Sequence, residues 1–330
     1  MEHRTLGRTA REVSAVGLGT WQLGADWGEV SESDAREVLE ASAEAGVTFY
    51  DTADVYGDGH SEQVVGRFLA AHPDAGFTVA TKMGRRVEQR PELYTPEAFR
   101  EWTDRSRRNL GVDTLDLVQL HCPPTAVIDD DRTYDALDAL VADGAIAAYG
   151  VSVETCDQAL AAIARPGVAS VQIIVNPLRL KPLDQVLPAA ADAGVGIVVR
   201  VPLASGLLSG KYDEATTFAD DDHRSYNRDG SAFDVGETFS GVPYDVGLAA
   251  ARDFAELVGS TAPGITSAQA AIAWAWQQPG VTTVIPGARS PEQARANAAA
   301  GDVPPLPGDL FAGVRALYDA RVRELVHDRW

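Results

Sequence analysis

The sequence has few of the features that mark secreted, membrane-bound or metal-binding proteins. Its 330 residues include only two cysteines, Cys122 and Cys156, and their spacing fits neither a metal-ligand pair nor a redox pair. No run of 18 or more apolar residues is present, which argues against a membrane-spanning helix. The first residues, MEHRTLG, lack the charged and then apolar pattern of a signal peptide. These absences predict a reduced, cytoplasmic protein.

Positive charge is also scarce. The chain carries 28 Lys and Arg against 48 Asp and Glu, a net charge of −20, and only three of its cations are lysines: Lys82, Lys181 and Lys211. Nucleic-acid binding requires a basic surface, so this class of function is excluded. A phosphate-bearing ligand would need a local group of cations against an unfavourable overall field.

What the sequence does contain is a regular alternation of short β-branched runs with longer helix-like segments. Strands are expected over 13–18, 47–50, 77–81, 115–120, 147–151, 170–175, 196–201 and 281–285. Helices are expected over 33–45, 62–71, 96–110, 132–142, 155–164, 183–193, 267–277 and 291–300. Eight such units in series favour an α/β fold of the closed (β/α)8 TIM-barrel type over an open doubly wound sheet. We expect one domain over residues 1–330.

Two segments lie outside this alternation. The first dozen residues, with a turn at 6–8, are expected to form a short hairpin that closes the bottom of the barrel. Residues 213–244, after the seventh strand, are acidic and rich in glycine. A loop of this length is uncommon unless it is functional. It is either a mobile flap over the carboxyl ends of the strands or a disordered surface insertion.

Three neighbouring strands end in residues that can carry out chemistry. Asp51 ends the second strand, with Tyr56 in the loop beyond, Lys82 ends the third and His121 the fourth. In a (β/α)8 barrel the active site lies at this edge. A nearby ammonium is expected to lower the tyrosine pKa from about 10, and a buried lysine needs a carboxylate partner. Each residue alone has an ordinary structural explanation, but together they predict an active site.

The pattern DTADVYG (51–57), followed by Thr81-Lys82 and Leu120-His121, resembles the aldo-keto reductase family. The similarity extends from GLGTW (17–21) to IPGAR (285–289) and Asn297. It implies a (β/α)8 barrel, a nicotinamide cofactor and interconversion of carbonyls and alcohols. It also implies that Tyr56 is the general acid/base, that Lys82 and Asp51 tune it, and that His121 orients the carbonyl. Trp21 would form the wall of the substrate pocket together with Tyr56 and His121.

The same resemblance implies a set of cofactor-binding residues. They are Gly19, Thr20, Trp21, Asp51, Ser152, Gln172, Arg200, Pro202, Leu203, Ser205, Gly206, Leu208, Lys211, Gly287, Arg289, Gln293 and Asn297. Lys211 would supply charge for a phosphate. Arg289 would lie near a 2′-phosphate, which favours NADP(H) over NAD(H).

Three places depart from the family pattern. One is Val175-Asn176, which lacks the aromatic residue that some relatives have there. Val153 stands where many members have asparagine, which removes one amide contact to the nicotinamide carboxamide. Arg200 stands where an aromatic residue usually stacks on the nicotinamide ring. We expect its positive charge to favour the neutral, reduced nicotinamide over the cationic, oxidised form.

The sequence therefore predicts an NADP-dependent oxidoreductase that acts on a small carbonyl or alcohol substrate, with neither nucleic acid nor membrane as a partner. Three alternatives stay open: a cofactor-binding regulatory subunit like the β subunits of voltage-gated potassium channels, an alcohol or sugar dehydrogenase working in the oxidative direction, and a metal-dependent barrel hydrolase. The last would need clustered histidines and carboxylates at the strand ends, where only His121 is expected, so no metal is predicted. Substrate, physiological direction and oligomeric state are left open.

Overall fold

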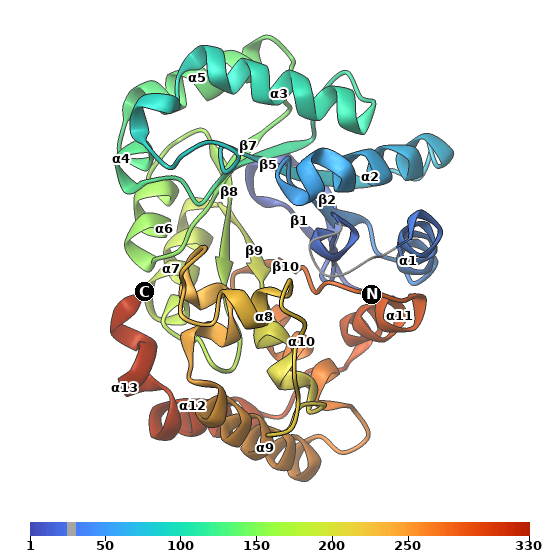
Figure 1. Ribbon diagram of the computed structural model, residues 1–330, viewed down its shortest axis with the longest axis vertical. Coiled ribbons are helices and arrows are strands. Elements are labelled where there is room, and N and C mark those ends of the chain that lie inside the picture. The colour runs from blue at the N-terminus through green and yellow to red at the C-terminus, as the bar shows by residue number, and fades with distance from the viewer. Residues whose placement is uncertain (25–30) are drawn as a thin grey trace.

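The computed structural model describes residues 1–24 and 31–330, and its centre is a ring of parallel strands with helices around it (Figure 1). The strands are β3 (Leu18–Gly19), β4 (Phe49–Asp51), β5 (Thr78–Met83), β6 (Leu117–His121), β7 (Tyr149–Ser152), β8 (Val168–Ile174), β9 (Gly196–Arg200) and β10 (Val281–Val284). They pair in chain order from β3 to β10. Parallel bridges from Val16 to Val284 and from Gly19 to Gly287 join the first strand to the last. The barrel is therefore closed, and the open-sheet alternative is wrong.

The helices expected between the strands are all present. They are α1 (Glu32–Glu44), α2 (His60–Ala71), α3 (Pro96–Leu110), α5 (Asp131–Ala142), α6 (Cys156–Ile163), α7 (Pro182–Ala193), α10 (Ser267–Trp276) and α11 (Pro291–Ala298). Three short helices, α4 (Thr125–Ile128), α8 (His223–Tyr226) and α13 (Arg323–Val326), lie in connections or near the end of the chain. Side-chain caps fix several helix starts: the Ser31 hydroxyl, for example, accepts from the Asp34 N–H.

Two long helices were not expected. They are α9 (Tyr244–Thr261) and α12 (Gly308–Arg321), which lie side by side at the outer edge of the barrel (Figure 1). Their sequences do carry a helical signal, since Leu248, Ala251, Phe254 and Val258 of α9 are all buried and fall on one face. None of the helices in the described ranges is long and apolar enough to cross a membrane.

The N-terminal hairpin closes the bottom of the barrel, as predicted. Its strands β1 (His3–Thr5) and β2 (Glu12–Ser14) pair antiparallel, and the fully buried Leu6 packs into an apolar layer inside the ring. The other members of this layer are Val13, Phe49, Ala80, Leu117, Val198 and Ile285. Because apolar side chains fill the lower interior, a polar site can only form at the opposite end, where the strands finish.

The expected first strand over 13–18 is wrong as a single element. Val13 and Ser14 belong to the hairpin, and only Leu18 and Gly19 pair with β4. Between them the side chains of Ser14 and Thr48 exchange hydrogen bonds with each other's backbone N–H groups, at 2.9 and 3.0 Å. Side-chain bonds of this kind replace the regular ladder between the first two barrel strands.

Candidate active site

A polar layer lies above the apolar one, at the carboxyl ends of the strands. The Lys82 ammonium pairs with Asp51 Oδ1, and its Nζ also lies 3.0 Å from the Thr52 carbonyl and 3.2 Å from the hydroxyl of Tyr56. Lys82 is 1% exposed and Asp51 is 2% exposed. The structure thus brings Asp51, Lys82 and Tyr56 together in one buried, hydrogen-bonded group.

Two glutamines complete the surroundings of Asp51. The Nε2 groups of Gln172 and Gln119 donate to Asp51 Oδ2 at 2.8 and 3.2 Å. Gln119 was not predicted as a site residue. It lies two positions before His121 on β6, so both side chains fall on the same face of that strand, and this spacing was the signal for it. With these bonds both carboxylate oxygens of Asp51 have partners.

Tyr56 is held by a tight turn. Residues 57–59 all have positive φ, and a Cβ at Gly57 would lie 1.9 Å from the Gly24 carbonyl oxygen. This close approach requires glycine, and it packs the Tyr56 loop on the segment that carries Trp21. The Trp21 and Tyr56 rings stack with centroids 5.9 Å apart. The Tyr56 hydroxyl is consequently fixed beside Lys82.

The pKa of Tyr56 moves opposite to the sequence expectation. Burial raises it, and although Lys82 lowers it as expected, the net direction is upward. Burial lowers the pKa of Lys82, but the charges of Asp51 and Tyr56 outweigh this effect and raise it. The neighbouring ammonium is therefore only a partial offset to desolvation. At neutral pH Tyr56 is a protonated phenol and Lys82 an ammonium, so the pair can donate a proton.

His121 lies on the other side of Tyr56. The two rings meet edge to face with centroids 5.9 Å apart. Burial, and then the charges of Arg85, Lys82 and Arg200, hold the pKa of His121 well below its usual value. Its Nδ1 has no hydrogen-bond partner among the described residues. The imidazole is therefore neutral at physiological pH and can orient a polar group by hydrogen bonding.

Arg200 is the centre of a buried ion cluster. Its Nη2 lies 2.9 Å from Glu154 Oε2 and 3.0 Å from Glu237 Oε1, and all three side chains are largely buried. The expectation that Arg200 adds positive charge beside the nicotinamide therefore needs correction, because two carboxylates neutralise it. Burial raises the pKa of Glu237, but Arg200 outweighs it and the net direction is downward. Glu237 therefore stays ionised.

Cys122, Glu154 and Glu237 place one ligand atom each within 4.8 Å of one another. Such a group was not expected, because the sequence showed only His121 among the strand ends. The guanidinium of Arg200 lies against all three, 3.7 Å from the Cys122 sulfur. Arg200 thus supplies the positive charge that these carboxylates need.

The 213–244 loop folds across the strand ends. Glu237 reaches Arg200, and the Ser205 hydroxyl donates to the Glu237 carbonyl at 2.9 Å and accepts from the Phe239 N–H at 3.0 Å. The rings of Phe233 and His223 pack on Trp21 at 6.0 and 5.2 Å. The segment therefore covers the site, and the alternative of a disordered surface insertion is wrong.

The residues predicted to hold a cofactor surround the same edge of the barrel. His121 of β6, Ser152 of β7 and Gln172 of β8 lie in one register. Gly19 bridges to Gly287, and the Thr20 hydroxyl donates to the Asp51 carbonyl at 3.0 Å. Pro202, Leu203, Ser205, Gly206 and Leu208 form the turn after β9, and Val153 is fully buried after β7.

Two exposed cations stand beyond this edge, on loops that follow the neighbouring strands β9 and β10. Lys211 and Arg289 bond their neighbours through backbone N–H groups, and no carboxylate of the described residues pairs with either side chain. Gln293 accepts from the Arg289 N–H at 2.8 Å, and Asn297 donates to the Gly287 carbonyl at 3.1 Å. This rim is a place where positive charge is available to an anionic ligand.

Backbone strain gathers at the same edge. Val201, Ala204 and Ser205 after β9, and Cys122 after β6, all have positive φ. For a β-branched residue such as Val201 this conformation is a genuine outlier. Strained residues of this kind persist where surrounding structure enforces them, often at ligand sites.

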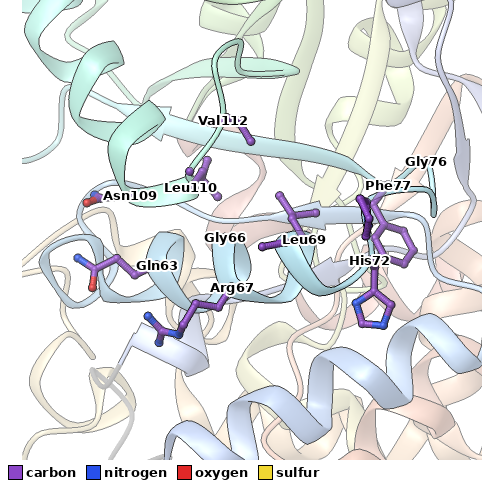
Figure 2. A pocket seen from close by; sticks show the side chains of 13 residues that line it. Gln63, Gly66, Arg67, Leu69, His72, Gly76, Phe77, Asn109, Leu110 and Val112 are labelled. Carbon is purple, nitrogen blue, oxygen red and sulfur yellow. The ribbon is translucent and has the colours of Figure 1, made fainter.

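A separate hollow of about 560 Å³ lies between α2 and the end of α3 (Figure 2). Gln63, Gly66 and Arg67 line it from α2, and Asn109 and Leu110 line it from α3. None of the predicted site residues borders this hollow. The candidate site is the polar layer of the barrel.

Comparison with known proteins agrees with this geometry. The Aldo/keto reductase family model matches residues 15–319. An aldo-keto reductase of Bacillus subtilis (strain 168) is 29% identical over 300 residues, which cover 90% of this chain and 87% of the relative. The solved glycerol dehydrogenase of Gluconobacter oxydans has a TM-score of 0.78 at 30% identity, covering 97% of this chain and 95% of that chain. An aldo-keto reductase of Klebsiella pneumoniae in complex with NADPH has a TM-score of 0.71 at 25% identity over 96% of each chain. The chain therefore belongs to the aldo/keto reductase family.

Proposed function

We propose that the protein is an NADP(H)-dependent oxidoreductase that interconverts aldehydes or ketones with alcohols, with Tyr56 as the general acid/base. The observation that carries this proposal is the buried chain from Asp51 through Lys82 to the Tyr56 hydroxyl. A phenol becomes an effective proton donor when its proton can leave beside a fixed positive charge. Lys82 supplies that charge, and Asp51 keeps Lys82 protonated and in place.

The residues present fit a dinucleotide phosphate. Lys211 and Arg289 offer exposed cations without carboxylate partners in the described chain, and the turn after β9 has consecutive left-handed residues, Ala204, Ser205 and Gly206. Such turns direct backbone N–H groups toward anions. In this proposal Lys211 holds the pyrophosphate and Arg289 the 2′-phosphate. The complex of the Klebsiella pneumoniae relative with NADPH supports the choice of NADP(H).

When bound, the reduced nicotinamide supplies the hydride that reduces the carbonyl carbon. The Tyr56 Oη–H then donates its proton to the carbonyl oxygen, which gives the alcohol and leaves a phenolate beside Lys82. His121 donates a hydrogen bond to the same oxygen while staying neutral. Trp21, Phe233 and the 213–244 loop exclude water from this space. In the oxidative direction the same groups act in reverse, with Tyr56 accepting the proton.

The test is a coupled measurement of binding and turnover. NADPH and NADH binding are measured by protein fluorescence, and NADPH consumption is followed by loss of its near-ultraviolet absorbance with a panel of aromatic and aliphatic aldehydes. We expect tight NADPH binding and turnover of several aldehydes. Tight binding with no turnover of carbonyls or alcohols would favour a cofactor-binding regulatory protein instead. Absence of NADPH binding would contradict the proposal outright.

A further inference from the structure

Arg85 stands at the start of the loop that follows β5 and reaches toward the reacting groups. Its Nη1 lies 3.5 Å from Nε2 of His121. This distance is at the outer limit of a hydrogen bond. The guanidinium is therefore close to His121 but bonds it weakly at most. Arg85 was not among the residues predicted from the sequence, where it is one of 28 lysines and arginines.

The backbone that carries Arg85 is fixed. Gly84 has a φ of +102°, and a Cβ there would lie 2.8 Å from the Tyr94 ring. The Gly84 carbonyl accepts from the Tyr94 hydroxyl at 3.2 Å and from Gln89 Nε2 at 3.0 Å. The Arg85 guanidinium also lies over the Phe233 ring, 5.5 Å from its centroid. Arg85 is therefore anchored at its base and along its side chain.

The charge of Arg85 is not neutralised in the way that the other site cations are. Lys82 pairs with Asp51, and Arg200 pairs with Glu154 and Glu237. No carboxylate within residues 1–24 and 31–330 forms an ion pair with Arg85, although the side chain is partly buried. Glu154 and Glu237 are the carboxylates nearby, and Arg200 already bonds both. Because no carboxylate in these ranges bonds the Arg85 guanidinium directly, its N–H groups can bind the carboxylate of an incoming ligand.

We propose that Arg85 binds a carboxylate of the substrate, so that the enzyme acts on short carbonyl acids in which at most two carbons separate the carboxylate group from the reacting carbonyl. This inference rests on the proposed function, because it takes the carbonyl oxygen to be held by Tyr56 and His121. Arg85 Nη1 and His121 Nε2 lie 3.5 Å apart, and with the His121 proton on Nε2 the two can donate to the carboxylate and carbonyl oxygens of such a molecule. Arginine binds carboxylates through two parallel hydrogen bonds, which also fixes their orientation.

The site around these donors suits a small substrate. Trp21 packs against Phe233 with centroids 6.0 Å apart, and Tyr56 stacks on the other side of Trp21. Phe233 also contacts the Arg85 guanidinium and Tyr56 meets the His121 ring edge to face, so apolar ring surface adjoins both donors. Once a carboxylate binds the guanidinium, Nε2 of His121 is left to donate to the carbonyl oxygen. The bond between Arg85 and the substrate carboxylate would then select for acids and also position the reacting carbonyl of the substrate.

The test compares matched acids and esters. We would measure kcat/KM for pyruvate and methyl pyruvate, and for 4-oxobutanoate and its methyl ester, in the parent and in Arg85→Gln. We expect Arg85→Gln to lower kcat/KM for the acids by roughly 10- to 100-fold, the usual effect of losing a hydrogen-bonded charge, while the esters change little. Arg90→Gln is the control, since Arg90 lies in the same loop, is exposed and pairs with Glu88. It removes the same charge and should leave the acid-to-ester ratio unchanged.

Arg85→Lys keeps the charge but loses the paired geometry, so it should retain part of the acid preference and guard against a folding defect in Arg85→Gln. An equal loss on acids and esters would overturn the proposal, because Arg85 would then act on the reacting oxygen or on the fold. A parent enzyme that reduces the esters as well as the acids would also overturn it, while leaving the proposed function intact. Absence of turnover with every carbonyl would contradict the proposed function itself.

Discussion

The Nζ atom of Lys82 lies between two partners, Asp51 Oδ1 on one side and the Tyr56 hydroxyl, 3.2 Å away, on the other. Asp51 is itself bonded by Gln119 and Gln172. The group therefore extends from β8 through the barrel interior to a loop at its rim. The glutamines hold Asp51 in place, and Asp51 holds Lys82. The Lys82 ammonium is therefore already positioned beside the Tyr56 hydroxyl before any proton is transferred.

Breaking the Asp51–Lys82 pair on one side should be costly. Lys82→Met leaves the buried Asp51 charge without its cation, and we expect the free energy of unfolding to fall by about 3–5 kcal/mol. The double variant Asp51→Asn/Lys82→Met removes both charges and should recover much of that loss in urea denaturation. Neither variant should retain carbonyl reductase activity, because both lack the Lys82 ammonium. Equal stability of the parent and Lys82→Met would show that the pair does not stabilise the fold.

The rate of carbonyl reduction should change little between about pH 6 and 9. The pKa of His121 is held well below its usual value of 6.5 and that of Tyr56 is raised above its ordinary value near 10, so we expect neither group to titrate within this range. The measurement is kcat/KM for one neutral aldehyde across this range in buffers of constant ionic strength. A drop in rate as the pH falls through 6.5 that disappears in His121→Gln would show that His121 titrates normally.

Asp54 should make the protein less stable as the pH rises. It is buried, neither carboxylate oxygen has a hydrogen-bond partner among the described residues, and burial, reinforced by Glu62, raises its pKa to about 7. The native state therefore binds a proton that the unfolded chain, with a pKa near 3.8, releases. The stabilisation is complete below pH 3.8 and is lost as the pH rises to 7, at about 1.36 kcal/mol per pH unit.

The variant Asp54→Asn removes this titration. We expect it to raise the melting temperature relative to the parent above pH 7 and to have little effect near pH 4. Asp74→Asn is the control, because Asp74 is exposed on a turn. The same stabilisation at both pH values would mean that Asp54 does not take up a proton on folding.

Arg289 should distinguish the two nicotinamide dinucleotides. Arg289→Gln is expected to weaken NADPH binding by roughly 10- to 100-fold and leave NADH binding unchanged, because only NADPH carries the 2′-phosphate. Arg295→Gln, on the helix α11 that follows Arg289, is the matched control, since Arg295 is exposed and pairs with Glu44. Fluorescence titration of each dinucleotide gives the dissociation constants. Parallel weakening of both would place Arg289 elsewhere than at the 2′-phosphate.

The barrel and the catalytic group were predictable from the sequence because both follow from the order of the strands. Parallel strands in series end at one edge, so Asp51, Lys82 and His121 had to meet there once eight β-α units were recognised. The helices α9 and α12 were missed for the same reason. They lie outside the alternation of strands and helices, and the helical spacing of their apolar residues was the only signal for them.

The partners of Arg200 could not be predicted in this way. Glu154 and Glu237 lie 46 and 37 positions from it in the sequence, on two different loops. Nothing local distinguishes them from the other acidic residues, so the neutralised charge of Arg200 emerges only from the packing of the 213–244 loop. The direction of the Tyr56 pKa is likewise a balance between burial and charge, which spacing alone does not give.

The measurement that tests the account most directly is the rate of hydride transfer in Tyr56→Phe beside the parent, in a single turnover with NADPH and an aldehyde that the parent reduces. The substitution removes only the hydroxyl and keeps the ring that stacks on Trp21. We predict a loss of about 10²- to 10⁴-fold in rate, the usual contribution of a general acid, with NADPH affinity little changed. Equal rates in the two proteins would contradict the role of Tyr56 and with it the proposed mechanism.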